Sequence, residues 1–210
     1  MEQVVYEGTR TPPQGKISFE AFLEWLDEDT HAEWVDGEVI LKMPVSVRHQ
    51  DTNSYLHSLI SLWVAYHYQG STYHPPLQVK LTLPSGRQVS REPDLVVILP
   101  SNSGQFQQHY FEGAPDLIVE ILSPSNRNID RLTKFEEYEA AGVPEYWLVD
   151  PDRQYAEFFQ LDETGVYRVA FSGSEGVYHS RVLAGLWLEV RWLWERPSVW
   201  EVLKQWGLAS

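Results

Sequence analysis

A run of apolar residues near the middle of the chain contains one acidic residue, and this combination limits what the segment can become. The stretch 114–125 reads APDLIVEILSPS, where the aliphatic residues predict a buried strand and Glu120 stands among them. An ionised carboxylate buried without a cation, a metal or hydrogen-bond donors costs several kcal/mol. We therefore expect the fold to bring a compensating group to Glu120.

A second carboxylate stands at the start of another apolar run. Asp94 precedes residues 95–99, which predict a second buried strand. If the two strands are neighbours, Asp94 and Glu120 lie close together and repel each other. A divalent cation relieves such repulsion, and hard oxygen ligands suit Mg²⁺ or Mn²⁺. The residues thus favour a metal site at these two carboxylates.

A helix predicted over 129–141 follows the strand that contains Glu120. Asp130, Lys134 and Tyr138 are four residues apart in sequence and therefore share one face of this helix. The ammonium of Lys134 would orient an attacking water or stabilise the charge that grows on a phosphate. The alternative is structural, with Lys134 serving only as the ion-pair partner of Glu120. The residues alone leave both interpretations open.

The predicted elements follow one another in the order α-β-β-β-α-β, which indicates an α/β protein. Helices are predicted over 18–28, 47–69 and 129–141, and strands over 77–83, 94–99, 116–122 and 145–150. Asp36-Gly37 predicts a tight hairpin between the flanking residues of 33–41. Further strands are predicted over 155–161, 167–171 and 186–194, followed by a short helix containing Trp200, Leu203 and Trp206.

These elements predict one domain over residues 1–210. Its core spans about 47–150, with an N-terminal helix and hairpin in residues 1–46 and a β-rich C-terminal arm in residues 151–210. Within that arm, residues 186, 188, 190, 192 and 194 are all apolar and alternate along a strand. Such a face is typical of a buried or paired sheet, so we expect a homodimer.

The acidic composition restricts the partners of the chain. The formal net charge is −14, and a negative field repels phosphate at long range. A nucleic-acid partner therefore needs local cationic patches, and two groups are candidates: Lys80, Arg87 and Arg91, and Arg127, Arg131 and Lys134. The alternative is that most of these side chains belong to ordinary solvated faces.

The chain has no cysteine, which excludes a disulfide framework and a thiolate zinc site. No stretch approaches the roughly 18 uncharged apolar residues of a membrane span. The N-terminus lacks a basic segment followed by an apolar one. We therefore expect a cytoplasmic protein without a membrane partner.

The combination of motifs resembles the Uma-two family of putative restriction endonucleases, within the PD-(D/E)XK nuclease superfamily. The matching motifs are Pro93-Asp94, the sequence VEILSPS around Glu120, the helix residues Asp130, Lys134 and Tyr138, and GVPEYWLVDP over 142–151. The likeness extends from EWVDGE over 33–38 to AGL over 184–186. It implies a restriction endonuclease-like core, with a mixed sheet flanked by helices, that hydrolyses phosphodiester bonds with a divalent metal.

The resemblance also implies roles for individual residues. Asp94 and Glu120 look like the two acidic metal ligands, and Lys134 looks like the catalytic lysine. The superfamily motif has its lysine two residues after the glutamate, where this chain has Leu122. Lys134, one helix later, is similar to the lysine of the family itself.

Four further residues match family positions that support the site. Glu33 is similar to an acidic residue that completes the metal shell, with an exposed hairpin residue as the alternative. His49 is a supporting residue whose alternative is a structural hydrogen bond. Asp130 and Tyr138 lie on the same helix face as the lysine.

Together these observations predict a nuclease dependent on Mg²⁺ or Mn²⁺, with nucleic acid, and DNA in particular, as its partner. Asp94, Glu120 and Lys134 would be catalytic, and Arg127 and Arg131 would contact the nucleic acid. The alternative is a non-catalytic interaction or dimerisation module that retains the nuclease fold. The net charge of −14 and the presence of Leu122 favour that alternative.

Overall fold

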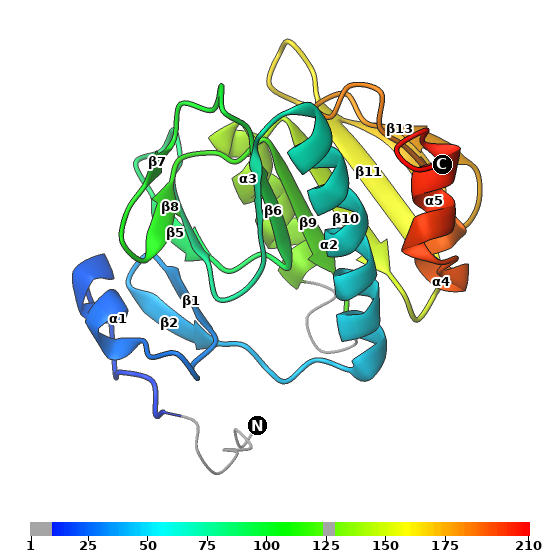
Figure 1. Ribbon diagram of the computed structural model, residues 1–210. Coiled ribbons are helices and arrows are strands. Elements are labelled where there is room, and N and C mark those ends of the chain that lie inside the picture. The colour runs from blue at the N-terminus through cyan, green and yellow to red at the C-terminus, as the bar shows by residue number, and fades with distance from the viewer. Residues whose placement is uncertain (1–9, 124–128) are drawn as a thin grey trace.

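A computed structural model describes residues 10–123 and 129–210 of the protein, with the side chains of 129–131 outside the description. Two six-stranded sheets form the body of the molecule (Figure 1). We call them the N-terminal sheet and the central sheet. The expected α/β class is confirmed, and no helix of the described residues is long and apolar enough to cross a membrane.

The N-terminal sheet contains, in spatial order, β2 (Glu38–Leu41), β1 (Ala32–Val35), β5 (Gln88–Arg91), β4 (Gln78–Thr82), β8 (Tyr110–Glu112) and β7 (Gln105–Phe106). The hairpin between β1 and β2 turns at Asp36 and Gly37, whose φ angles of 49° and 94° are both positive. Two positive φ angles are what a tight two-residue turn requires. The predicted hairpin is therefore confirmed.

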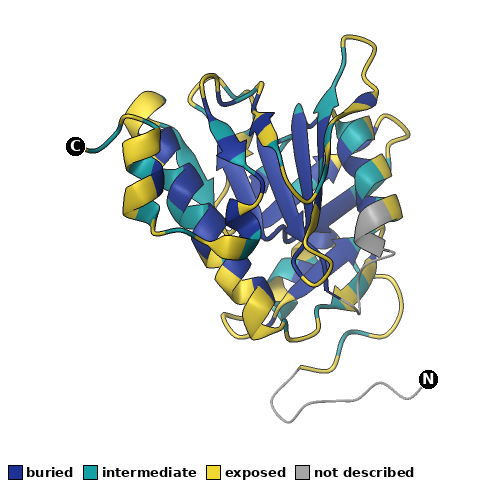
Figure 2. Ribbon diagram, turned by 90° about the vertical axis from the view of Figure 1, so that its right-hand side faces the viewer, coloured by how far each residue is buried: buried dark blue, intermediate teal, exposed yellow. Residues whose placement is uncertain are grey.

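The central sheet contains, in spatial order, β12 (Tyr167–Gly173), β11 (Tyr155–Leu161), β10 (Glu145–Asp150), β9 (Leu117–Ile121), β6 (Leu95–Ile98) and β3 (Ser71–Tyr73). Strand β9 pairs in parallel with β10 and antiparallel with β6. Every residue of β6, β9 and β10 is buried (Figure 2). Strands covered on both faces are expected to read as continuous apolar runs, as these do.

Helices and a short third sheet cover the two large sheets, with α1 packed on the N-terminal sheet. They are α1 (Phe19–Trp25), α2 (Val47–His67), the π-helix Ile129–Lys134, α3 (Phe135–Ala141), α4 (Trp192–Glu195) and α5 (Val199–Gln205), with strands β13 (Val177–His179) and β14 (Trp187–Glu189). Helix α2 and the C-terminal elements share one core with the central sheet. Helix α3 and part of the N-terminal sheet share the other.

Local signals explain where the two N-terminal helices begin. The side chain of Ser18 accepts a hydrogen bond from Ala21 N, and that of Ser46 accepts one from His49 N. Each serine thus satisfies a backbone donor of the first helical turn. The predicted helices over 18–28 and 47–69 are confirmed, although α1 ends earlier, at Trp25.

The prediction of one strand over 186–194 is wrong. Strand β14 covers only Trp187–Glu189, and the chain enters α4 at Trp192. Leu186, Leu188 and Val190 pack into the core that contains α2. The apolar alternation that predicted a homodimer therefore reflects packing within one chain.

Two parts of the expected strand order also differ. The predicted strand over 77–83 becomes β4 and belongs to the N-terminal sheet, whereas those over 94–99 and 116–122 become β6 and β9 of the central sheet. Strand β5 was not predicted, because Gln88-Val-Ser-Arg91 lacks a sustained apolar run. This missed strand connects β1 to β4 and carries Arg91 into the interior.

Candidate active site

Glu120 on β9 is met by two side chains from the following helical segment. Its Oε1 lies 3.0 Å from Lys134 Nζ and accepts a 2.7 Å hydrogen bond from Tyr138 OH. Lys134 ends the π-helix, a rare geometry that is frequent at functional sites, and Tyr138 is one turn later in α3. The predicted shared face of these two residues is confirmed, and a cation does compensate Glu120.

Asp94 directly precedes β6, the antiparallel neighbour of the strand that carries Glu120. Leu95 pairs with Val119, so the next pair in this antiparallel register is Asp94 with Glu120. Asp94 Oδ2 accepts hydrogen bonds from Ile121 N at 2.7 Å and from His49 Nε2 at 3.1 Å. Burial raises the pKa of Asp94, but His49, Lys42 and the Ile121 amide outweigh it, and the pKa falls below its ordinary value.

Glu33 on β1 holds the other side of Lys134. Its Oε1 lies 2.9 Å from Lys134 Nζ, and its Oε2 accepts from Arg91 at 2.7 Å. Burial raises the pKa of Glu33, but the charges of Lys134, Arg91 and Lys42 lower it further, to about 2. The alternative of an exposed hairpin residue is wrong, because Glu33 is buried. Both of its oxygens already contact cations.

Arg91 continues this network to the helix behind the sheet. It lies 2.7 Å from both Glu33 and Glu137, and Arg87 contacts the other oxygen of Glu137 at 3.0 Å. Glu137 is the residue before Tyr138 in α3. The network therefore fixes the helix that presents Tyr138 and Lys134 to Glu120.

The cationic patch predicted at Lys80, Arg87 and Arg91 does not form. Arg91 is buried, Arg87 pairs with Glu137, and Lys80 pairs with Glu112 at 3.1 Å. The second predicted patch lies mostly outside the described residues. Arg127 belongs to the segment 124–128, and the side chains of Asp130 and Arg131 are likewise outside the description.

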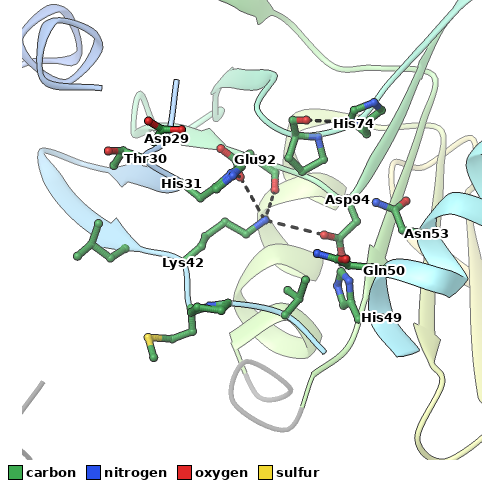
Figure 3. A pocket seen from close by; sticks show the side chains of 15 residues that line it. Asp29, Thr30, His31, Lys42, His49, Gln50, Asn53, His74, Glu92 and Asp94 are labelled. Atoms are coloured by element: carbon green, nitrogen blue, oxygen red, sulfur yellow. Dashed lines mark hydrogen bonds and ion pairs between the residues drawn. The ribbon is translucent and has the colours of Figure 1, made fainter. Parts of the chain in front are cut away.

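Lys42, which directly follows β2, is a site residue that the sequence did not indicate. Its Nζ donates to Glu92 O at 2.7 Å and lies 3.7 Å from Glu92 Oε1 and 3.9 Å from Asp94 Oδ1 (Figure 3). Burial lowers the pKa of Lys42, but the charges of Asp94, Glu120 and Glu92 raise it more than Lys134 opposes them. No local motif marks this lysine, because the fold of the hairpin alone brings it to Asp94.

The carboxylates can be compared with what a divalent metal requires. No group of three or more His, Asp or Glu side chains among the described residues is arranged to hold a metal ion. Mg²⁺, however, usually takes only one or two carboxylates and completes its shell with water and phosphate oxygens. The pKa of Asp94 is lowered, and both of its hydrogen bonds within the described residues are on Oδ2, so that Oδ1 has only the 3.9 Å contact to Lys42 and can accept a metal. Asp94 and Glu120 thus fit Mg²⁺ or Mn²⁺ as oxygen ligands.

Comparisons with known proteins bear on the family and the fold of the chain. A family model named Uma2 and described as "putative restriction endonuclease" matches residues 19–191. The chain is also similar to the crystal structure of a putative nuclease belonging to DUF820 from Anabaena variabilis. That match has a TM-score of 0.68 and 22% identity, and covers 85% of this chain and 98% of that chain. No curated protein matches. The likeness confirms the expected fold.

Proposed function

Because the chain belongs to the Uma2 family of putative restriction endonucleases, we propose that it is a metal-dependent nuclease that hydrolyses DNA. One observation carries the proposal. Two buried carboxylates lie on neighbouring segments, Asp94 directly before β6 and Glu120 on β9, and Lys134 contacts Glu120. This set combines oxygen ligands for a metal with a fixed positive charge, which are the elements of phosphodiester hydrolysis.

In this proposal Asp94 and Glu120 would hold Mg²⁺ or Mn²⁺. The bound metal would polarise the phosphodiester and lower the pKa of the attacking water. Lys134 is fixed between Glu120 and Glu33, at 3.0 and 2.9 Å, so its ammonium needs no reorganisation during the reaction. A preorganised cation of this kind stabilises the negative charge that develops on the phosphate.

The neighbouring residues act by positioning. The Ile121 amide and His49 hold Asp94 Oδ2, which directs the Oδ1 of this carboxylate towards Lys42. Tyr138 holds Glu120, and burial together with the charge of Glu120 keeps the pKa of this phenol well above its ordinary value. Tyr138 therefore stays a hydrogen-bond donor at any pH at which the protein would work.

A cleavage assay tests the proposal. Purified protein is incubated with plasmid DNA, single-stranded DNA and RNA in Mg²⁺, Mn²⁺ or Ca²⁺, and the Asp94→Ala variant serves as the control. We expect DNA cleavage with Mg²⁺ or Mn²⁺ and none after the substitution. Cleavage that survives Asp94→Ala would indicate a contaminating nuclease. A folded wild type that cleaves nothing with any of these metals would contradict the proposal.

A non-catalytic interaction module is the second candidate function. It is favoured by the direct contact between Lys134 and Glu120, because such an ion pair offsets the cost of burying a glutamate even when neither residue is catalytic. The net charge of −14 favours it as well. This module should bind no Mn²⁺ at Asp94, and Mn²⁺ should leave its melting temperature unchanged.

A further inference from the structure

A pocket opens beside Asp94, on the side of Lys42. It has a volume of about 410 Å³ and is lined by residues from the segment before β1, the end of β2 and the loop after it, the start of α2, the loop before β4, and the segment between β5 and β6. The residues that matter below are Lys42, Met43, His49, Asn53, His74 and Pro75. Pockets of this size enclose one small molecule or one nucleotide unit. A length of duplex does not fit into them.

Lys42 presents its ammonium to this pocket. Figure 3 shows its side chain reaching towards Glu92 and Asp94, and its side chain is 18% exposed. Among the described residues, its one close hydrogen bond is to Glu92 O at 2.7 Å, whereas the two carboxylate contacts are 3.7 and 3.9 Å long. An ammonium has three donors. Lys42 can therefore donate to an anionic ligand oxygen without leaving its anchor.

Two further polar atoms of the pocket residues have no partner among the described residues. They are His49 Nδ1 and Asn53 Oδ1, both buried. A buried polar atom without a hydrogen bond costs about 1–3 kcal/mol, so such atoms are expected to acquire a partner from a ligand or water. Both belong to α2, on adjacent turns, and both residues line the pocket. They indicate a ligand that carries hydrogen-bonding groups as well as charge.

The remaining wall is less polar. Met43 is 48% exposed, and it lines the pocket together with Pro44 and Pro75. His74 lines the pocket next to Pro75, and histidine rings can stack on nucleobases. A ligand that combines a phosphate with a flat, hydrogen-bonding ring matches the Lys42 ammonium, the polar atoms and the apolar wall. Asp29, Glu92 and Asp94 also line the pocket, and a divalent cation at Asp94 would offset their charge towards a phosphate.

We propose that this pocket binds one unpaired nucleotide of the substrate, with Lys42 holding its phosphate and Asn53 contacting its base. The choice of a nucleotide as the ligand rests on the proposed function, but nucleotide binding can be measured without any cleavage. Asp94 Oδ1 lies 3.9 Å from Lys42 Nζ, so a phosphate at Lys42 is adjacent to the candidate active site. A base paired in a duplex cannot enter, and the protein should therefore prefer single strands or frayed ends.

Calorimetric titration with thymidine 3′,5′-bisphosphate, in the presence of Ca²⁺, tests the binding. Lys42→Met should weaken binding about tenfold or more, because one charge-assisted hydrogen bond is lost. Asn53→Ala should weaken it by a smaller factor. Lys16→Met is the matched control, because this substitution also removes one positive charge. Lys16 pairs with Asp36 at the turn of the hairpin, the end opposite to Lys42. Inorganic phosphate should bind more weakly than the nucleotide.

The outcomes separate this inference from the proposed function. If the wild type cleaves DNA while Lys42→Met and Asn53→Ala bind the nucleotide as the wild type does, the pocket assignment is overturned and the nuclease stands. If the wild type binds the nucleotide through Lys42 but cleaves nothing, the pocket assignment is supported and the proposed nuclease function is contradicted. Equal affinity for phosphate and nucleotide would overturn the role of the base. If Lys42→Met fails to fold, Asn53→Ala decides the question.

Discussion

Glu120 and Glu145 are both buried glutamates in adjacent parallel strands, but their surroundings differ in kind. Glu145 accepts hydrogen bonds from Trp147 and Tyr178 on Oε1, and from Ser180 and the amides of residues 181 and 182 on Oε2. All these donors are neutral. Glu120 instead contacts a lysine that also contacts Glu33, and a second carboxylate, Asp94, directly precedes the neighbouring strand β6.

The difference teaches how to interpret an acidic residue in an apolar strand. Neutral donors hydrogen-bond to both oxygens of Glu145, so this side chain links the central sheet to the segment 178–182. A shared cation and a second carboxylate make Glu120 part of a charged cluster that can accept a metal. Burial of the acid alone does not separate the two cases, because both are buried to the same degree.

The largest expected effect is on stability, from Glu145→Gln. The amide nitrogen of the glutamine would stand in place of Oε2, which accepts from three donors, or, in the flipped orientation, in place of Oε1, which accepts from two. In either orientation donors lose their acceptor, so the unfolding free energy should fall by about 4 kcal/mol. Glu120→Gln is the matched variant. Its amide oxygen can still accept from Lys134 and Tyr138, so it should lose about 1 kcal/mol. Urea unfolding of both variants measures the contrast, and equal losses would remove the distinction.

The charged cluster should also govern acid stability. Glu33 has its pKa lowered from 4.5 to about 2, so its contribution is complete above pH 4.5 and is lost as the pH falls towards 2. The amount is on the order of 3 kcal/mol. Unfolding free energies measured from pH 6 to pH 2 should fall more steeply for the wild type than for Glu33→Gln. Parallel curves would contradict the role of Glu33.

Lys134→Arg separates chemistry from ion pairing. Lys134→Met would leave two buried carboxylates without their shared cation and so would lose stability in either account. Arginine keeps the charge but changes its geometry. We expect cleavage to fall about 10²-fold, or about 2.7 kcal/mol, with a melting temperature close to that of the wild type. Full activity in this variant would favour the structural pair.

Asp94→Asn should change the stability of the metal-free protein less than Glu145→Gln does. The repulsion expected between Asp94 and Glu120 is offset by Lys42, His49 and the Ile121 amide, so the substitution should cost about 1–3 kcal/mol rather than stabilise. Mn²⁺ should raise the melting temperature of the wild type increasingly with concentration and should affect the variant much less. A wild type indifferent to Mn²⁺ would argue for the interaction module.

The sequence allowed local features of the fold and part of the site to be predicted. Asp36-Gly37 specified its turn, and the four-residue spacing of Lys134 and Tyr138 placed both at one oxygen of Glu120. The position of Glu120 predicted a compensating group, because a charge within an apolar strand has a large desolvation cost. These inferences depend on neighbouring residues or on one side chain.

The rest depends on pairing between distant segments. Lys42 reaches Asp94 and Arg91 reaches Glu33 only because two sheets and a hairpin meet there, which no local pattern encodes. Glu145 carried the same signal as Glu120, yet its donors lie 33 to 37 residues later, apart from Trp147. The strand predicted over 186–194 failed because alternation marked a buried face without revealing that the chain turns into α4.

The central claim is that Asp94 and Glu120 together hold a divalent metal. The most direct test is a crystal of the wild-type protein soaked in Mn²⁺, with diffraction recorded at the manganese absorption edge. We expect an anomalous peak within coordinating distance of Asp94 Oδ1 and a Glu120 oxygen, about 2.0–2.2 Å for a small hard cation. The same soak of Glu145→Gln should keep the peak, and Glu120→Gln should lose it. A fully soaked wild type without a peak between these two carboxylates would contradict the claim.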